Sequence, residues 1–283
     1  MMSASTLDEI RKVVVEQLNK LDGVVALRKS SGSVAPHVFQ KGDDLSGLEI
    51  NPKYPVMTIV SKLHKAFPDI HLGVVARGCD ERAYVEMAKR NQIDPDRLFI
   101  IGFACTAEDA QACYCGEPYP TRLMVGTPPP PGPVNPLVAQ YDAMSLAERQ
   151  AFWKRQFDKC IKCYGCRNIC PECFCEACAM EDMAWVEPGL LAPPFPSFHL
   201  IRAMHMASRC IACRECERTC TAHIPLTVLY DLMRRDIGSL MGYVPGANLK
   251  APPPLSVTLE EVSLRQGDPH HPHTIPLSPI GHG

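Results

Sequence analysis

The apolar residues of the first half of the chain alternate between helical and strand-like periods. An apolar-periodic run over 7–21 predicts an N-terminal helix. Two short apolar runs, 72–77 and 98–104, predict strands, and the segment 81–91 between them predicts a helix. A strand, a helix and a second strand in this order indicate a βαβ unit with parallel strands and a right-handed crossover. We therefore expect an α/β domain with a parallel sheet.

The second half shows helical periods only. A capping box that opens at Ser145 predicts a helix up to about residue 158. Two further apolar-periodic segments, 198–208 and 225–237, also predict helices. Because no strand pattern is found over 142–243, this part is expected to be mostly α-helical.

Proline marks the boundary between the halves. Eight prolines fall within 118–136, including four in a row at 128–131, and such a stretch forms an extended spacer without packed elements. The end of the chain is rich in proline and histidine, which favours a disordered or partner-wrapping arm over a metal site at 270–273. We predict four segments: an α/β domain at 1–117, a Pro-rich linker at 118–141, a helical domain at 142–243 and an extended tail at 244–283.

Composition and charge exclude several classes of protein. With 283 residues and a formal net charge of −2, the chain has no basic arm for nucleic acid and no polybasic membrane patch. Its longest apolar runs, such as 98–105, fall far below the roughly 20 residues of a membrane span, and its N-terminal segment lacks the apolar stretch of a secretory signal. We expect a cytoplasmic protein. Its 15 cysteines are odd in number and clustered, so they indicate metal binding rather than disulfides.

The strongest chemical signal is a cysteine motif that occurs twice. The spacing C-x2-C-x2-C-x3-C begins at Cys160 and returns 50 positions later, at Cys210. In proteins with two [4Fe–4S] clusters, the first three cysteines of such a motif bind one cluster and the fourth binds the other. Zinc, the alternative, rarely uses this repeated spacing. We therefore assign one cluster to Cys160, Cys163, Cys166 and Cys220, and a second to Cys210, Cys213, Cys216 and Cys170.

Two further sets of residues lie near these motifs. Cations beside an anionic cluster stabilise its reduced form, although ordinary solvated charge is an equal alternative for each of Lys159, Lys162, Arg167, Arg209, Arg214 and Arg218. Three additional cysteines follow the first motif. They bind a further metal only if a fourth ligand comes from elsewhere, and otherwise lie reduced beside the cluster: Cys173, Cys175 and Cys178.

Four more cysteines lie in the α/β domain. Cys79 follows the first predicted strand, Cys105 follows the second, and Cys113 and Cys115 follow a short helix that Thr106 is expected to cap. Because the carboxyl ends of parallel strands line the ligand crevice of such a sheet, we expect these thiols to converge there. The sequence favours a third [4Fe–4S] cluster at this point, with buried, inert thiols as the alternative.

Parts of the chain resemble a known family. The segments 78–83 (GCDERA) and 100–105 (IIGFAC), and the spans 160–178 and 198–210, resemble the beta subunits of coenzyme F-420 hydrogenases and dehydrogenases. The wide separation of the two motifs is similar to the α-helical ferredoxin domain of succinate dehydrogenase iron–sulfur subunits and heterodisulfide reductase subunits. The resemblance implies partner subunits of formate dehydrogenase, hydrogenase or heterodisulfide reductase type. FAD is a further cofactor to consider, but an α/β part of about 117 residues is short for a complete flavin-binding domain.

We therefore expect an iron–sulfur electron-transfer subunit that relays electrons between partner subunits of a multisubunit oxidoreductase in an anaerobe. In such a subunit the clusters carry the electrons, and the protein sets their spacing and potential. One alternative is a flavin-containing subunit that passes electrons from a nicotinamide or deazaflavin coenzyme into its clusters. Another is an iron–sulfur sensor or assembly protein, although the chain has no DNA-reading element.

Overall fold

The computed structural model describes residues 4–182, 186–187 and 189–254. Within these ranges the strands form one mixed, six-stranded sheet: β1 (Gly23–Ser30), β2 (Ser33–Phe39), β3 (Leu48–Glu49), β4 (Leu72–Ala76), β5 (Leu98–Phe103) and β6 (Leu123–Val125). The strand order is β2-β1-β4-β5-β6, and β3 pairs with β1.

The parallel part of this sheet contains the predicted βαβ unit. β4 pairs in parallel with β5 from Leu72 opposite Leu98 to Ala76 opposite Gly102, and helix α3 (Gly78–Ala88) connects the two strands. β1 also lies parallel to β4, and β6 lies parallel to β5. The prediction of an α/β fold with parallel strands is confirmed for this half.

The hairpin of β1 and β2 adds an antiparallel edge that the apolar pattern does not predict. Ser31 and Gly32 form its two-residue turn, with φ angles of 50° and 83°. Positive φ at both central residues matches the twist of a hairpin, and glycine adopts it without steric cost. β2 lies on the side of β1 away from β4, so the parallel strands β1, β4, β5 and β6 lie next to one another in the sheet.

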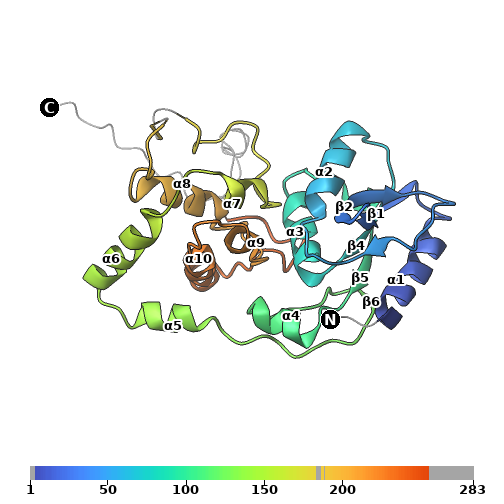
Figure 1. Ribbon diagram of the computed structural model, residues 1–283, viewed down its shortest axis with the longest axis horizontal. Coiled ribbons are helices and arrows are strands. Elements are labelled where there is room, and N and C mark those ends of the chain that lie inside the picture. The colour runs from blue at the N-terminus through green and yellow to red at the C-terminus, as the bar shows by residue number, and fades with distance from the viewer. Residues whose placement is uncertain (1–3, 183–185, 188, 255–283) are drawn as a thin grey trace, which may run out of the picture.

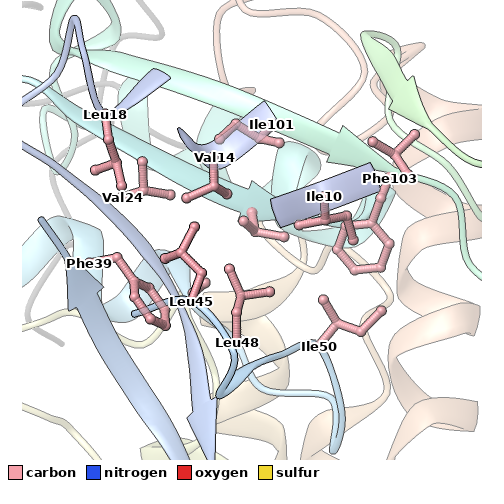
Figure 2. Packing of buried hydrophobic residues seen from close by; sticks show 13 residues of the cluster. Ile10, Val14, Leu18, Val24, Phe39, Leu45, Leu48, Ile50, Ile101 and Phe103 are labelled. Atoms are coloured by element: carbon pink, nitrogen blue, oxygen red, sulfur yellow. The ribbon is translucent and has the colours of Figure 1, made fainter. Parts of the chain in front are cut away.

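Helices cover both faces of the sheet (Figure 1). On one face, α1 (Ala4–Gln17) packs Ile10 into the same cluster as Val24 of β1, and Figure 2 shows both side chains in this layer. On the other face, α2 (Met57–Ala66) and α3 share a cluster with Val25. Successive residues of β1 therefore point to opposite layers, as the two-residue period of a strand requires.

Two helices of this half differ from their predicted bounds. α1 spans 4–17 rather than 7–21, and turns lead from it to β1. α3 begins at Gly78, directly after β4 and three residues earlier than predicted, so Cys79 lies in its first turn. A Cβ on Gly78 would lie 2.5 Å from the carbonyl oxygen of Tyr119. This close approach of two backbone segments requires glycine at the start of the helix.

The proline-rich segment 118–141 is not extended throughout. It contains β6, which forms an edge of the sheet, and most of α5 (Pro136–Asp142). Asn135 caps α5 by accepting a hydrogen bond from the Leu137 N–H. The expectation that this segment holds no packed element is therefore wrong at these two points, and the stretch 126–135 between them is without helix or strand.

The described part of the second half contains helices and no strand: α6 (Leu146–Phe157), α7 (Gly165–Asn168), α8 (Ser197–Met206), α9 (Glu215–Arg218) and α10 (Leu226–Met241). Ser145 and Glu148 form the predicted capping box at the start of α6. Phe157, Met206 and Val228, from or beside α6, α8 and α10, share one buried cluster. The prediction of a mostly helical second half is confirmed, whereas its identity as a ferredoxin domain remains a prediction.

The two halves contact each other through α3 (Figure 1). The buried Glu86 carboxylate accepts hydrogen bonds from Tyr243 Oη at 2.8 Å and from the Gly246 N–H at 2.7 Å, both in the second half. Lys89 Nζ at 3.1 Å and Arg90 Nη1 at 2.6 Å pair with the same carboxylate. Burial alone raises the pKa of Glu86, but these hydrogen bonds outweigh it and hold the pKa below its ordinary value.

The histidine-rich segment 270–273 lies outside the described residues. In the part of the chain that the structure describes, no helix is long and apolar enough to cross a membrane.

Candidate metal centres

The two cysteine motifs fold into loops with the same backbone conformation. Lys162 and Tyr164 flank Cys163 with φ angles of 51° and 57°, and Ala212 and Arg214 occupy the equivalent positions of the second motif with 55° and 69°. Left-handed conformations are uncommon for residues other than glycine, so their repetition at equivalent positions indicates a shared constraint. A chain that turns sharply on both sides of its middle cysteine can direct three cysteines toward one bound group.

Two cavities lie where these loops meet, and four cysteines line each of them. Each cavity takes three cysteines from one motif and the fourth cysteine from the other, which is the crosswise sharing that the sequence predicts. The first cavity is lined by Cys160, Cys163, Cys166 and Cys220, and the second by Cys210, Cys213, Cys216 and Cys170.

The four cysteines of the first half also line one cavity, at the carboxyl edge of the sheet. Cys79 lies in the first turn of α3 and Cys105 follows β5. Thr106 caps α4 (Ala107–Ala112) as predicted, and Cys113 ends this helix. The next residue, Tyr114, has a φ of 46°, so a left-handed residue again turns the chain between two cysteines, here Cys113 and Cys115. Ala212 and Arg218 of the second half also line it, which places this cavity at the contact between the halves.

Two buried cations lie against the thiols of this cavity. Lys53 Nζ is 3.9 Å from Cys113 Sγ, and Arg82 Nη2 is 3.8 Å from Cys115 Sγ. Burial alone lowers the pKa of Lys53, but its electrostatic interactions with Cys79, Cys213, Cys113 and Glu215 outweigh it and raise the pKa above its ordinary value. Without a bound metal, burial raises the pKa of the Cys105 thiol to about 12. Cations in these positions offset the negative charge of a thiolate-bound cluster, so the cavity fits such a group.

Arg202 holds a comparable position between the other two cavities. It lines the second cavity and donates a hydrogen bond at 2.9 Å to the carbonyl oxygen of Cys166, a residue of the first. It also bonds Tyr230 Oη. Arg202 is buried, and no carboxylate among the described residues forms an ion pair with it. A buried guanidinium needs a counter-charge, and anionic clusters in the flanking cavities would supply it.

His199 lies in the wall of the first cavity. Its ring stacks on Phe157 with the ring centroids 3.9 Å apart. Burial lowers the pKa of His199 to about 4, so the ring is neutral at pH 7. Apolar, neutral walls of this kind strengthen the interaction between a cluster and the charges that remain near it.

Most of the basic residues that flank the motifs have bonding partners of their own. Several form ion pairs with carboxylates or bond backbone carbonyls, which offsets their charge: Arg167 pairs with Glu181, Arg214 with Asp231 and Arg218 with Glu215, while Lys159 and Lys162 donate to the carbonyl oxygens of His223 and Glu187. Arg209 Nη1 lies 3.9 Å from Cys175 Sγ. Lys162, Arg214 and Arg218 nevertheless line the first, the second and the N-terminal cavity. Lys53 and Arg202, which no local spacing identifies, join them by bonding residues of two cavities each.

The three additional cysteines line a separate, open cleft beside α2. The cleft is shared with Cys170, His205 and Lys65, and Cys175 is exposed. In the described ranges, no group of three or more His, Cys, Asp or Glu side chains is arranged to hold a single metal ion. Whether Cys173, Cys175 and Cys178 bind a metal therefore stays an open expectation.

Comparison with known proteins gives matches over part of the chain. No protein-family model matches it. It is 41% identical over 101 residues to the F420-dependent formate dehydrogenase subunit beta of Methanocaldococcus jannaschii, which covers 36% of this chain and 27% of that protein. It is 41% identical over 103 residues to the F420-dependent formate dehydrogenase 1 subunit beta of Methanococcus maripaludis, covering 36% of this chain and 26% of that one. The chain thus spans about a quarter of the length of these relatives, and the resemblance stated from the sequence is confirmed over about a third of the chain.

Proposed function

From the similarity to formate dehydrogenase beta subunits and the three cysteine-lined cavities, we propose that the chain is an iron–sulfur electron-transfer subunit. It relays electrons between partner subunits of a cytoplasmic, multisubunit oxidoreductase of an anaerobe. The observation that carries this proposal is that twelve cysteines gather into three separate quartets. Four thiolates are the usual ligand set of one [4Fe–4S] cluster, and its chemistry is the transfer of single electrons.

The twelve cysteines are the ligands of three [4Fe–4S] clusters in this proposal. The first centre takes Cys160, Cys163, Cys166 and Cys220, the second takes Cys210, Cys213, Cys216 and Cys170, and the N-terminal centre takes Cys79, Cys105, Cys113 and Cys115. Thiols must lose their protons to bind metal, so loading releases protons from groups whose pKa burial has raised, such as Cys79 and Cys105.

The contacts between the cavities support one order for the relay. Lys53 bonds a thiol of the N-terminal quartet and, at 2.6 Å, the carbonyl oxygen of Cys213 in the second. Arg202 lines the second cavity and bonds Cys166 of the first. Electrons would therefore pass through the N-terminal, second and first centres in that spatial sequence. Cys163 of the first centre is exposed, which makes this end suited to exchange with a partner subunit.

The test is to purify the chain anaerobically and measure iron, acid-labile sulfide and flavin per polypeptide, with EPR spectra of the reduced protein. We expect about twelve irons and no stoichiometric flavin, because each cubane holds four irons. About eight irons would contradict the N-terminal centre while keeping a two-cluster relay. The variant Cys113→Ser, with Cys175→Ser as the matched control, should lose about four irons where the control keeps them all.

The second candidate is a flavin-containing subunit that passes electrons from a nicotinamide or deazaflavin coenzyme into the clusters. The similarity to beta subunits of F420-dependent formate dehydrogenases favours it. Stoichiometric flavin released from the purified protein would support this candidate, and reduction of the clusters by reduced deazaflavin would identify the donor. Partners of formate dehydrogenase, hydrogenase or heterodisulfide reductase type fit either candidate.

A further inference from the structure

Lys53 places a buried ammonium group at the contact between the halves. Its side chain is 12% exposed, and it donates a hydrogen bond at 2.6 Å to the carbonyl oxygen of Cys213. On its other side, Nζ lies 3.9 Å from Cys113 Sγ. Glu215 Oε1, at 3.5 Å, is its carboxylate partner. Lys53 therefore touches one proposed ligand of the N-terminal centre and one of the second centre at the same time.

Other bonds hold this arrangement in place. Arg214 donates to the carbonyl oxygen of Cys113 at 3.0 Å, and Arg82 donates to the carbonyl oxygen of Ile211 at 3.2 Å. Both bonds cross from one half to the other. Because the surrounding backbone is fixed on both sides, the ammonium group cannot move toward one centre without losing its contact with the other.

We propose that Lys53 is a positioning residue that raises the reduction potentials of the N-terminal and second centres together, leaving the first centre unaffected. The proposal rests on the proposed function, since it requires clusters in both cavities. Adding an electron to a cluster adds one negative charge, and a cation fixed in a water-poor site stabilises that charge strongly. Glu215 opposes this effect, because its carboxylate lies beside the same ammonium group.

The test is an EPR-monitored redox titration of the iron-loaded full chain. In Lys53→Met, the ratio of reduced to oxidised cluster at a fixed potential should fall about tenfold at both centres, which corresponds to about 59 mV for a one-electron couple. Lys53→Arg keeps the positive charge, so its reduction potentials at both centres should stay close to those of the wild type. The control Lys12→Met removes an exposed lysine of α1 and should change none of the three potentials. In Glu215→Gln, the same ratio should rise at both centres.

The outcomes separate the role of Lys53 from the proposed function. Wild-type protein with about twelve irons and unchanged potentials in Lys53→Met would overturn the role of Lys53 alone, as would equal shifts at all three centres. If Lys53→Met fails to load iron, Glu215→Gln decides, and the absence of a rise in that variant overturns the proposal. If the wild-type protein holds only about eight irons, the N-terminal centre is absent. Lys53 then cannot raise the potentials of two centres together.

Discussion

The contact between the halves includes one buried carboxylate with partners on both sides, so replacing Glu86 with alanine is a sensitive test of the structure. Glu86 accepts hydrogen bonds from Tyr243 and Gly246 of the second half and pairs with Lys89 and Arg90. The side chains of these two cations are only 3% and 8% exposed. Glu86→Ala therefore removes one of the contacts between the halves and leaves two buried cations without their carboxylate partner.

The expected cost follows from these contacts. Breaking a buried ion pair by removing one partner costs about 3–5 kcal/mol, because the remaining charge stays buried and unpaired. For a chain of this size each kcal/mol lowers the melting temperature by about 2–4 °C, so the variant should melt about 6–20 °C lower. Because the folded pKa of Glu86 is held below its ordinary value, its contribution is complete above about pH 4.3 and is lost as the pH falls through the folded pKa.

The assay is thermal unfolding of iron-loaded protein followed by circular dichroism under anaerobic conditions. Glu16→Ala is the matched control, because Glu16 also pairs with a lysine one helical turn away, Lys20, but both side chains are about two-thirds exposed. Exposed pairs contribute about 0–1 kcal/mol, so this control should melt close to the wild type. If Glu86→Ala melts no lower than Glu16→Ala, Glu86 does not tie the halves together and the reasoning is refuted.

Three further predictions concern the centres and their supports. His199 has a folded pKa of about 4, so below about pH 6.5 the unfolded state binds a proton on this ring and the folded state does not. The free energy of unfolding should therefore fall by about 2 kcal/mol between pH 6.5 and 5, and in His199→Gln it should depend less on pH over this range. Cys163→Ser should lose about four irons, or keep them with a changed EPR spectrum of the first centre. An unaltered spectrum and iron content would show that Cys163 is not a ligand. Gly78→Ala should lower the free energy of unfolding, measured with urea, by at least about 1 kcal/mol, because the new Cβ would lie 2.5 Å from the Tyr119 carbonyl oxygen. An unchanged stability would mean that the backbone around Cys79 can shift to make room for the methyl group.

Local signals in the sequence are sufficient for several of the elements and for the grouping of the cysteines around the cavities. The strands β4 and β5, the capping residue Thr106 and the capping box at Ser145 all lie where short-range patterns place them. The crosswise grouping of the cysteines into cavities follows from motif spacing, because a tight loop has few ways to direct three side chains inward. The convergence of Cys79 and Cys105 follows from the rule that parallel strands end at one edge.

Residues that act across long separations cannot be found in this way. Lys53 contacts Cys213, 160 positions later, and nothing in its neighbourhood distinguishes it from a surface lysine. Arg202 lies inside an apolar-periodic helix, and its burial becomes meaningful only once Cys166 is seen beside it. The strand β6 could not be predicted from periodicity either, because it has only three residues and is held by pairing with β5. The hairpin at Ser31 was not predicted, although its strands have eight and seven residues.

The crosswise sharing of cysteines has a consequence for how the second half is held together. With iron bound as proposed, each centre joins residues on either side of the segment between the motifs, so the two centres form two crosslinks between its ends. If a protease cuts this segment, the two fragments would remain linked through the iron–cysteine bonds of the clusters. They would separate only after chelation or oxidation of the clusters. Conversely, losing either centre frees one end of the other motif and enlarges the loop that the remaining centre must close. Each centre should therefore make assembly of the other more favourable.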